Sequence, residues 1–260
     1  MLIYTYDNTL EGFLSCVFEA YSSGEQPEDI CFEGTMQYRI DQELKPIETI
    51  DEHWKRVLSG IQRKLGRMAW TKVRCCYCAS TPDKETQLYR YIRHGFDKGS
   101  NALNNLSHPD VLAIENLYRN VGMEQQRMIM FARFAKIPEG VYCATINPKH
   151  NVLPLIMSHF ANRFNVQPFI IYDEVHQIAG ISENGQWYLS EADGLTLPRA
   201  DTDDEVYQDL WKSFYDAICI PERLNEKRRV GFMPKRLWKH LPEMHPRKSG
   251  GSRQLPSQDS

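Results

Sequence analysis

Basic residues are concentrated near the carboxyl end of the chain, around one tryptophan. Residues 222–248 contain nine Lys or Arg and three Glu, a local balance of +6, whereas the rest of the chain carries 22 basic and 31 acidic residues. Cations bind a phosphate backbone by releasing its counterions, and an indole offers a face on which a base can stack. The pattern therefore indicates nucleic-acid binding, with a solvated amphipathic helix and a basic tail as the alternative. The residues with suitable side chains in this segment are Arg223, Arg228, Arg229, Arg236 and Trp238.

Trp238 has two possible roles within that segment. Pro234 is expected to begin a short helix, because proline is favoured at the first helical position. Leu237 and Trp238 would then face inward. This placement favours Trp238 as a core anchor, and a platform for a base is the alternative.

Two further groups of polar residues could contact phosphate. His159 and Arg163 are four positions apart, so on a helix they share one face, and both can donate hydrogen bonds to phosphate oxygens. The alternative is that they border the core and pair with a local carboxylate. Glu124, Arg127 and Arg133 surround an expected helix-to-strand junction, where they would form either a buried ion pair or a phosphate clamp.

Acid–base chemistry has three weak candidates, Glu124, His159 and Asp173. Asp173 follows an apolar strand, with Glu174 next and His176 two positions further on. A carboxylate beside an imidazole can act as a general acid or base. If the strand continued, however, Asp173 would point away from Glu174 and His176, because successive side chains of a strand alternate. Structural hydrogen bonding is therefore the alternative role for Asp173.

The chain lacks the usual sequence signatures of metal and cofactor sites. Cys75 and Cys78 form one CxxC pair, but a tetrahedral zinc site needs four ligands, and Cys143 and Cys219 stand alone. No glycine-rich nucleotide loop, GxSxG or HExxH motif occurs. We therefore expect free thiols and neither a metal nor a cofactor.

Composition is typical of a globular protein in a reducing compartment. The 260 residues are 42% apolar and 25% charged, and no apolar run reaches the ~18 residues of a membrane span. Asp7 and Glu11 lie where a signal peptide would carry cations. The seven cysteines form no disulfide framework. These features predict a cytoplasmic protein that does not interact with a membrane.

The first third of the chain is expected to form a small α/β subdomain, residues 1–95. Residues 2–6 predict a strand, and Asp7-Asn8-Thr9 could cap the helix that follows. Residues 30–32 predict a second strand, residues 49–52 resemble a capping box, and a further helix is expected over 83–95. The Gly- and Asn-rich residues 95–108 predict a loop and a possible seam between subdomains.

Residues 96–243 predict an α+β domain whose mostly antiparallel sheet is covered by helices. Strands are expected over 128–136 and 141–147, followed by a helix with an apolar stripe from 153 to 164 and a buried strand over 169–172. Asn184-Gly185 between apolar-flanked runs predicts a hairpin. Asp203 and Asp204 are expected to open a final long helix. Residues 244–260 lack core-forming side chains, and we expect a disordered tail.

Several short motifs carry a resemblance to a bacterial family described as probable DNA metabolism proteins. The opening segment, residues 6–21, resembles the start of that family. Later motifs of this chain resemble the middle and end of the family. They are Phe131-Ala132-Arg133-Phe134, Asn151 to Leu155, His159-Phe160, Arg163-Phe164, Glu222-Arg223, Met233 to Arg236, Trp238 and Leu241 to Glu243. This latter part resembles a domain of unknown function, the one numbered 4130. The resemblance covers residues 1 to about 243.

The resemblance implies a role beside another protein. Members of the family are proposed to work with a putative DNA modification or repair protein of the radical S-adenosylmethionine (radical SAM) class, and the same region resembles a module fused ahead of a uracil-DNA glycosylase-like domain. It implies no catalytic residues, so we expect any base excision to come from a partner. The sequence thus predicts an accessory DNA-binding protein of a modification or repair system. The alternatives are a hydrolytic DNA-processing enzyme, such as a nuclease or glycosylase-like hydrolase, and a protein-binding scaffold.

Overall fold

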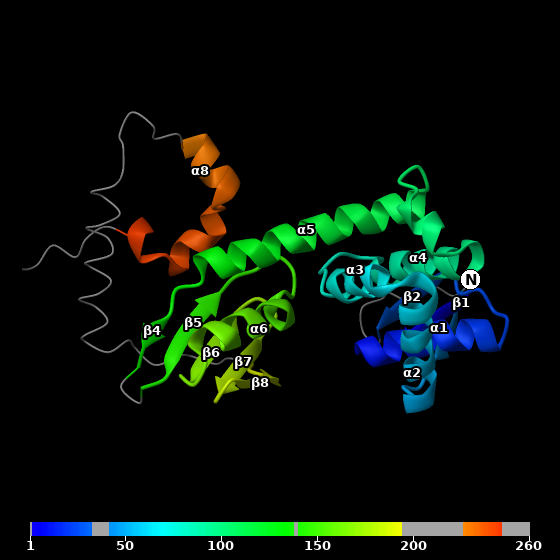
Figure 1. The fold of residues 1–260 in the computed structure, drawn as a ribbon, viewed down its shortest axis with the longest axis horizontal. Helices are drawn as coiled ribbons and strands as arrows, with labels where there is room; N and C mark the ends of the chain where they lie inside the picture. The colour runs from blue at the N-terminus through cyan, green and yellow to red at the C-terminus, as the bar shows by residue number, and fades with distance from the viewer. Residues whose placement is uncertain (1, 33–41, 138–139, 194–225, 246–260) are drawn as a thin grey trace, which may run out of the picture. The chain divides into compact units, whose positions relative to one another are not determined.

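The computed structural model describes residues 2–32, 42–137, 140–193 and 226–245, which belong to two compact units. Unit 1 comprises Met1–Gln126 and Pro148–Ile156, and unit 2 comprises Arg127–Asn147 and Met157–Ser260. Figure 1 shows the elements of both. The units do not correspond to the boundaries expected at residues 95 and 243, and those boundaries stay predictions.

Unit 1 contains a small parallel sheet. Its central strand β1 (Leu2–Tyr6) lies between β2 (Asp29–Phe32) and β3 (Glu43–Pro46), and both neighbours run parallel to it. Ile3 and Tyr4 are fully buried. A short apolar run of this kind suits the central strand of a parallel sheet, which is covered on both faces. The two strands expected at residues 2–6 and 30–32 are confirmed.

Helix α1 (Leu10–Ser22) begins with the cap that the sequence predicts. The hydroxyl of Thr9 accepts a hydrogen bond from the backbone N–H of Gly12 at 2.9 Å. The capping box expected over residues 49–52 is wrong, because α2 (Asp51–Gly60) begins after Ile50 without any side-chain cap. The Thr49 hydroxyl instead donates to Asp7 Oδ2 at 2.8 Å, and this bond ties the start of α2 to the turn before α1.

The remaining helices of unit 1 follow in sequence. A π-helical turn, η1 (Ile61–Leu65), continues α2 and leads to α3 (Arg67–Tyr77) and α4 (Lys84–Lys98). The helix expected over 83–95 is thereby confirmed. Residues 95–108 include a short 3-10 helix, η2 (Ser100–Asn104), before α5 (Pro109–Phe131), whose last residues belong to unit 2.

Unit 2 contains a five-stranded sheet in the order β4-β5-β6-β7-β8. The strands are β4 (Ala135–Lys136), β5 (Tyr142–Ile146), β6 (Phe169–Asp173), β7 (Ile178–Glu183) and β8 (Gln186–Glu191). Only β5 and β6 are parallel among these described strands, and α6 (Leu153–Phe164) lies between them in sequence. The predicted α+β fold with a mostly antiparallel sheet is therefore confirmed.

Two features fix the arrangement of this sheet. Asn184 and Gly185 both have positive φ, 53° and 76°, so they form the tight turn expected between β7 and β8. A Cβ atom added to Gly180 would lie 2.2 Å from Met157 Sδ, which shows how closely α6 approaches β7. Phe134, Phe160 and Phe169 pack beside them with ring centroids 5.1 and 5.9 Å from Phe134.

The strand expected over residues 128–136 is wrong for most of its length. Residues 128–131 are the last turn of α5, and β4 contains only Ala135 and Lys136. A four-residue apolar run does not distinguish helix from strand. The choice follows from the preceding residues, since the buried positions of α5 recur every three or four residues, at Val111, Ile114, Leu117, Val121, Glu124 and Met128.

Other expectations fall partly or wholly outside the described residues. The helix expected from Asp203 and residues 246–260 of the expected tail lie there. Across the ranges that the structure describes, no helix has the length and apolar character needed to cross a bilayer.

The turn between β1 and α1 provides a stability test. Replacing Gly12 by alanine would place a Cβ 2.2 Å from Asp7 Oδ1, which already accepts hydrogen bonds from Thr9. We expect Gly12→Ala to destabilise the protein by about 2 kcal/mol, because the side chains must move apart. The control is Gly122→Ala in α5, where the added Cβ meets nothing within 4 Å. It should stabilise the helix by about 0.5–1 kcal/mol. Urea unfolding measures both changes, and equal effects would contradict the packing described.

Candidate functional site

The carboxyl ends of β5 and β6 gather polar side chains at one edge of the sheet. Because these strands are parallel, the residues that follow them, Asn147 and Glu174, come out at the same edge, where ligands bind in many α/β proteins. The two are joined directly, since Asn147 Nδ2 donates to Glu174 Oε1 at 2.6 Å. This contact is the base of the candidate site.

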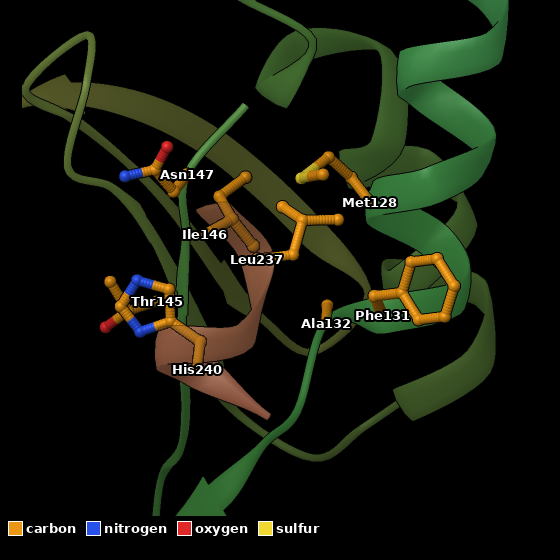
Figure 2. A pocket seen from close by; sticks show the side chains of 8 residues that line it. All are labelled: Met128, Phe131, Ala132, Thr145, Ile146, Asn147, Leu237 and His240. Atoms are coloured by element: carbon orange, nitrogen blue, oxygen red, sulfur yellow. The ribbon is translucent and has the colours of Figure 1, made fainter. Parts of the chain in front are cut away.

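A carboxyl-terminal segment of unit 2 packs at this edge. It comprises α8 (Glu226–Phe232) and the 3-10 helices η4 (Lys235–His240) and η5 (Pro242–Met244). Leu237 and Leu241 are buried, with exposures of 5% and 0%. Figure 2 shows Leu237 pointing between Ile146 of β5 and the end of α5. Arg236 Nε also donates to the backbone oxygen of Asn147 at 3.3 Å.

Glu174 holds the strand edge and this segment together. Lys239 Nζ lies 2.8 Å from Glu174 Oε2, and His240 Nε2 lies 3.1 Å from Oε1. Burial by itself would raise the pKa of Glu174. The hydrogen bonds from Lys239, Asn147 and His240 outweigh it and lower the pKa to about 2. Glu174 is therefore a permanent anion near neutral pH and suits positioning rather than proton donation.

Asp173 and His176 form a second pair beside Glu174. Fully buried Asp173 accepts from the backbone N–H groups of Val175 and His176 through Oδ1, and its Oδ2 lies 2.7 Å from His176 Nδ1. The expectation that alternation separates these side chains is wrong. Strand β6 ends at Asp173, and a turn reaching Gln177, with φ of 55°, folds His176 back. A carboxylate on Nδ1 fixes the ring orientation, as acid–base catalysis by histidine requires.

The pocket beside this edge is small. Its volume is about 10 Å³, which accommodates about one water molecule and is far too little for a nucleobase. Figure 2 shows its lining, with His240 and Thr145 on one side and the α5 side chains Met128 and Phe131 on the other. The lining residues are Met128, Phe131, Ala132, Thr145, Ile146, Asn147, Leu237 and His240.

Two basic side chains lie over the indole ring of Trp238. The guanidinium carbon of Arg229 lies 4.9 Å and Lys235 Nζ 5.8 Å from centroids of the indole, and the Trp238 Nε1–H donates to the Met233 oxygen at 3.0 Å. Half-buried Trp238 thus organises its own segment through cation–π contacts. Arg223 lies outside the described residues. Arg228 belongs to α8, but its side chain is not described.

The residues around the end of α5 have separate partners. In unit 2, Arg133 forms an ion pair with Glu243 at 2.7 Å, and Arg127 donates to the Gly231 oxygen at 3.3 Å. In unit 1, buried Glu124 accepts from the Lys149 backbone N–H at 2.7 Å. An ion pair at Arg133 thus exists, but with an acid 110 positions away in sequence.

His159 and Arg163 lie exposed on α6. The ring of His159 contacts Phe160 edge-on at a centroid distance of 5.1 Å. Neither residue has an ion-pair partner among the described acids. Both side chains are exposed and could donate to an anion.

The CxxC cysteines form no cluster with a third potential metal ligand among the described residues. Cys75 is buried and Cys78 half-buried, and burial raises their pKa values to about 11 and about 12, so both thiols are protonated at neutral pH. Within the described parts of the chain, no group of three His, Cys, Asp or Glu side chains could hold a metal ion.

Comparison with known protein families places these residues in context. A family model described as a domain of unknown function (DUF4130) matches residues 82–243, which is more than half of the chain. The chain belongs to the DUF4130 family. A comparison with curated proteins found no match.

The DUF4130 match contains both the strand edge and the carboxyl-terminal segment. We call Asn147, Asp173, Glu174, His176, Lys239 and His240 the carboxyl-edge cluster. Asn147, Lys239 and His240 were missed as site residues by the sequence interpretation. The signal was available for Asn147, because it and Glu174 follow two apolar strands that a helix separates, an order typical of parallel pairing. Nothing local predicted His240.

Glu174 should give the cluster a measurable pH dependence. Its pKa is lower in the folded state, about 2, than the ordinary value of 4.5. Its stabilising contribution is therefore complete above about pH 5 and is lost as the pH falls toward 2. We expect Glu174→Gln to lower the unfolding free energy at pH 7 by roughly 2–3 kcal/mol and to flatten this acid limb. Urea unfolding between pH 7 and 2.5 is the measurement. Exposed Glu183→Gln on β7 is the control, and an unchanged acid limb in Glu174→Gln would contradict the network.

Proposed function

We propose that this DUF4130 protein is an accessory DNA-binding protein of a DNA modification or repair system. The observation that carries the proposal is the packing of the basic carboxyl-terminal segment on unit 2. Leu237 and Leu241 are buried, while Lys235 and Lys239 on the same 3-10 helix are exposed. Cations held on an ordered element bind phosphate with less loss of conformational entropy than cations on a free tail.

The geometry distinguishes two kinds of basic residue. Arg133, Arg229 and Arg236 are engaged with Glu243, Trp238 and the Asn147 backbone, and we assign them to holding the segment in place. Lys235 lies over the Trp238 ring and Lys239 beside Glu174, but both side chains are exposed, and we assign them to DNA phosphates. Lys239 also neutralises Glu174, so its charge is only partly available.

Other exposed groups extend the proposed contacts. His159 and Arg163 on α6 supply two further donors in unit 2, and Arg223 and Arg228 remain part of the proposal from sequence alone. Trp238 contributes indirectly, because its cation–π contacts orient Arg229 and Lys235.

The chemical step is assigned to a partner. A pocket of about 10 Å³ beside the carboxyl-edge cluster does not accept a flipped base. The family resemblance suggests a radical SAM or glycosylase-like enzyme as this partner.

DNA affinity tests the proposal directly. We expect the full chain to bind single- or double-stranded oligonucleotides with an affinity that falls steeply with salt. Lys235→Ala/Lys239→Ala should reduce the slope of log K against log salt by about 0.9–1.8 on duplex DNA, because about 0.9 is lost per phosphate contact and Lys239 shares its charge with Glu174. Fluorescence anisotropy measures both quantities.

The control for charge alone is Arg74→Ala/Arg90→Ala, which removes two exposed cations from α3 and α4. Its slope should match that of the unmodified protein. Undetectable binding to both forms of DNA at low salt would end the proposal.

A second function, hydrolysis of DNA by the protein itself, is favoured by one specific observation. Fully buried Asp173 holds half-buried His176 at 2.7 Å in a carboxylate–imidazole pair. Such a pair can activate a water for attack. Of the catalytic candidates expected from sequence, Asp173 is the one that contacts an imidazole in the part of unit 2 that the structure describes.

Turnover separates the two functions. If the protein is an accessory factor, the pure chain leaves uracil-containing and damaged-base oligonucleotides intact, with or without divalent metal. Cleavage or base release that is lost in both Asp173→Asn and His176→Ala, and kept in Glu183→Gln, would establish the enzyme instead. Gel analysis after alkali treatment detects both products.

A further inference from the structure

Unit 1 contains a cleft that the proposed function does not use. Its volume is about 530 Å³, within the range of pockets that hold small ligands. Helices α1, α2 and α4 and the π-turn η1 supply its walls. The lining residues are Phe18, Tyr21, Ser22, Arg56, Val57, Gly60, Arg63, Lys64, Phe96 and Asp97. Only Phe96 and Asp97 of these lie within the DUF4130 match.

The cleft has an excess of positive charge. Arg56, Arg63 and Lys64 line it and are exposed. No acid in the described ranges lies within ion-pair distance of any of the three. The one acidic side chain in the lining, Asp97, is 3.7 Å from Arg93 Nε. Three cations therefore face one carboxylate that already has another basic neighbour.

Aromatic rings and a backbone carbonyl hold these cations, rather than acids. Arg56 lies 5.8 Å from the centroid of Phe18, and Lys64 lies 5.9 Å from that of Phe96. Arg63 Nε donates to the Ser59 oxygen at 3.3 Å. Contacts of this kind orient a cation without neutralising it, so the charge remains to attract an anion.

Tyr21 adds a neutral donor and a ring. Its side chain is 45% exposed and packs edge-on against Phe96 at 5.9 Å. Burial, together with the nearby Asp97 carboxylate, raises the pKa of Tyr21 to about 12. The hydroxyl is therefore protonated at neutral pH and can donate to an anionic oxygen, while the exposed ring offers a surface for a planar group.

We propose that this cleft binds the phosphate groups of a nucleotide unit, with Arg56, Arg63 and Lys64 on the phosphate and Tyr21 beside the base or sugar. The unit can come from a free nucleotide or from a single strand of nucleic acid. Guanidinium and ammonium groups next to an exposed aromatic ring match this combination of anion and planar ring. The inference is independent of the proposed function, because no residue of the carboxyl-terminal segment lines the cleft.

The experiment measures binding of three probes to the full chain: fluorescein-labelled (dT)8, thymidine 5′-triphosphate and inorganic pyrophosphate. Arg63→Ala/Lys64→Ala should lower the affinity for each probe that binds by at least about tenfold, because charge-assisted hydrogen bonds are lost. On (dT)8 the salt slope should also fall by about 1.4, or about 0.7 for each single-strand phosphate contact. Arg74→Ala/Arg90→Ala, with the same loss of charge outside the cleft, should change affinity by less than about twofold.

A steric variant tests the cleft without altering charge. Gly60 has helical φ and ψ, −63° and −48°, and a Cβ added there lies 3.4 Å from Phe96 Cζ, an acceptable contact. Gly60→Leu should therefore fold, extend its side chain into the cleft and reduce binding by a similar factor. Circular dichroism and the thermal midpoint verify that both cleft variants keep the fold.

Each result has one meaning. Loss of triphosphate and pyrophosphate binding in the cleft variants assigns the site to free nucleotides, whereas loss restricted to (dT)8 assigns it to a strand. Equal weakening in the cleft and control variants, or no binding of any probe by the unmodified chain, overturns the inference. If no cleft variant weakens probe binding but Lys235→Ala/Lys239→Ala lowers duplex affinity, the cleft inference fails and the proposed function stands. If the cleft variants weaken probe binding but Lys235→Ala/Lys239→Ala leaves duplex affinity unchanged, the proposed function fails and the cleft inference stands.

Discussion

The parallel pairing of β5 with β6 is the constraint on which the candidate site depends. In a sheet whose other described neighbours are antiparallel, this one pair places two strand ends at the same edge. Asn147 and Glu174 meet there, and the Glu174 carboxylate then receives Lys239 and His240. With antiparallel pairing the two residues would lie at opposite ends of the strands, and the carboxyl-terminal segment would lose its ionic attachment.

The same segment shows how a strongly basic sequence becomes an ordered element. Its described cations differ in exposure, and the difference follows from the apolar residues between them. Burial of Leu237 and Leu241 fixes the register of the two 3-10 helices, so Arg236 turns toward the Asn147 backbone while Lys235 faces outward. Charge density in the sequence therefore does not show which of these cations are exposed. In unit 1, Arg56 and Lys64 lie over aromatic rings and Arg63 donates to a backbone carbonyl, and none of the three has an acid of the described ranges within ion-pair distance.

Features with a local physical cause could be predicted from sequence. The Thr9 cap, the Asn184-Gly185 turn and the apolar stripe of α6 each depend on residues within a few positions of one another. The errors also have identifiable physical causes, and one of them is a contact between residues distant in sequence. The run at Met128 was too short to distinguish helix from strand, and the capping box at Thr49 failed because a distant aspartate, Asp7, takes its hydroxyl. Asp173 was misjudged because alternation was continued past the point where the strand ends.

By itself, the sequence determined the α+β class, most of the helices and the basic character of the carboxyl end, because these follow from periodicity, turn chemistry and composition. Only the tertiary structure decided which cations have acidic partners and which polar residues meet. Arg133 and Glu243 are 110 positions apart, and Asn147 and Lys239 reach Glu174 from different elements. Such contacts depend on strand order and on which leucines enter the core, and neither is encoded in the spacing of the residues that touch.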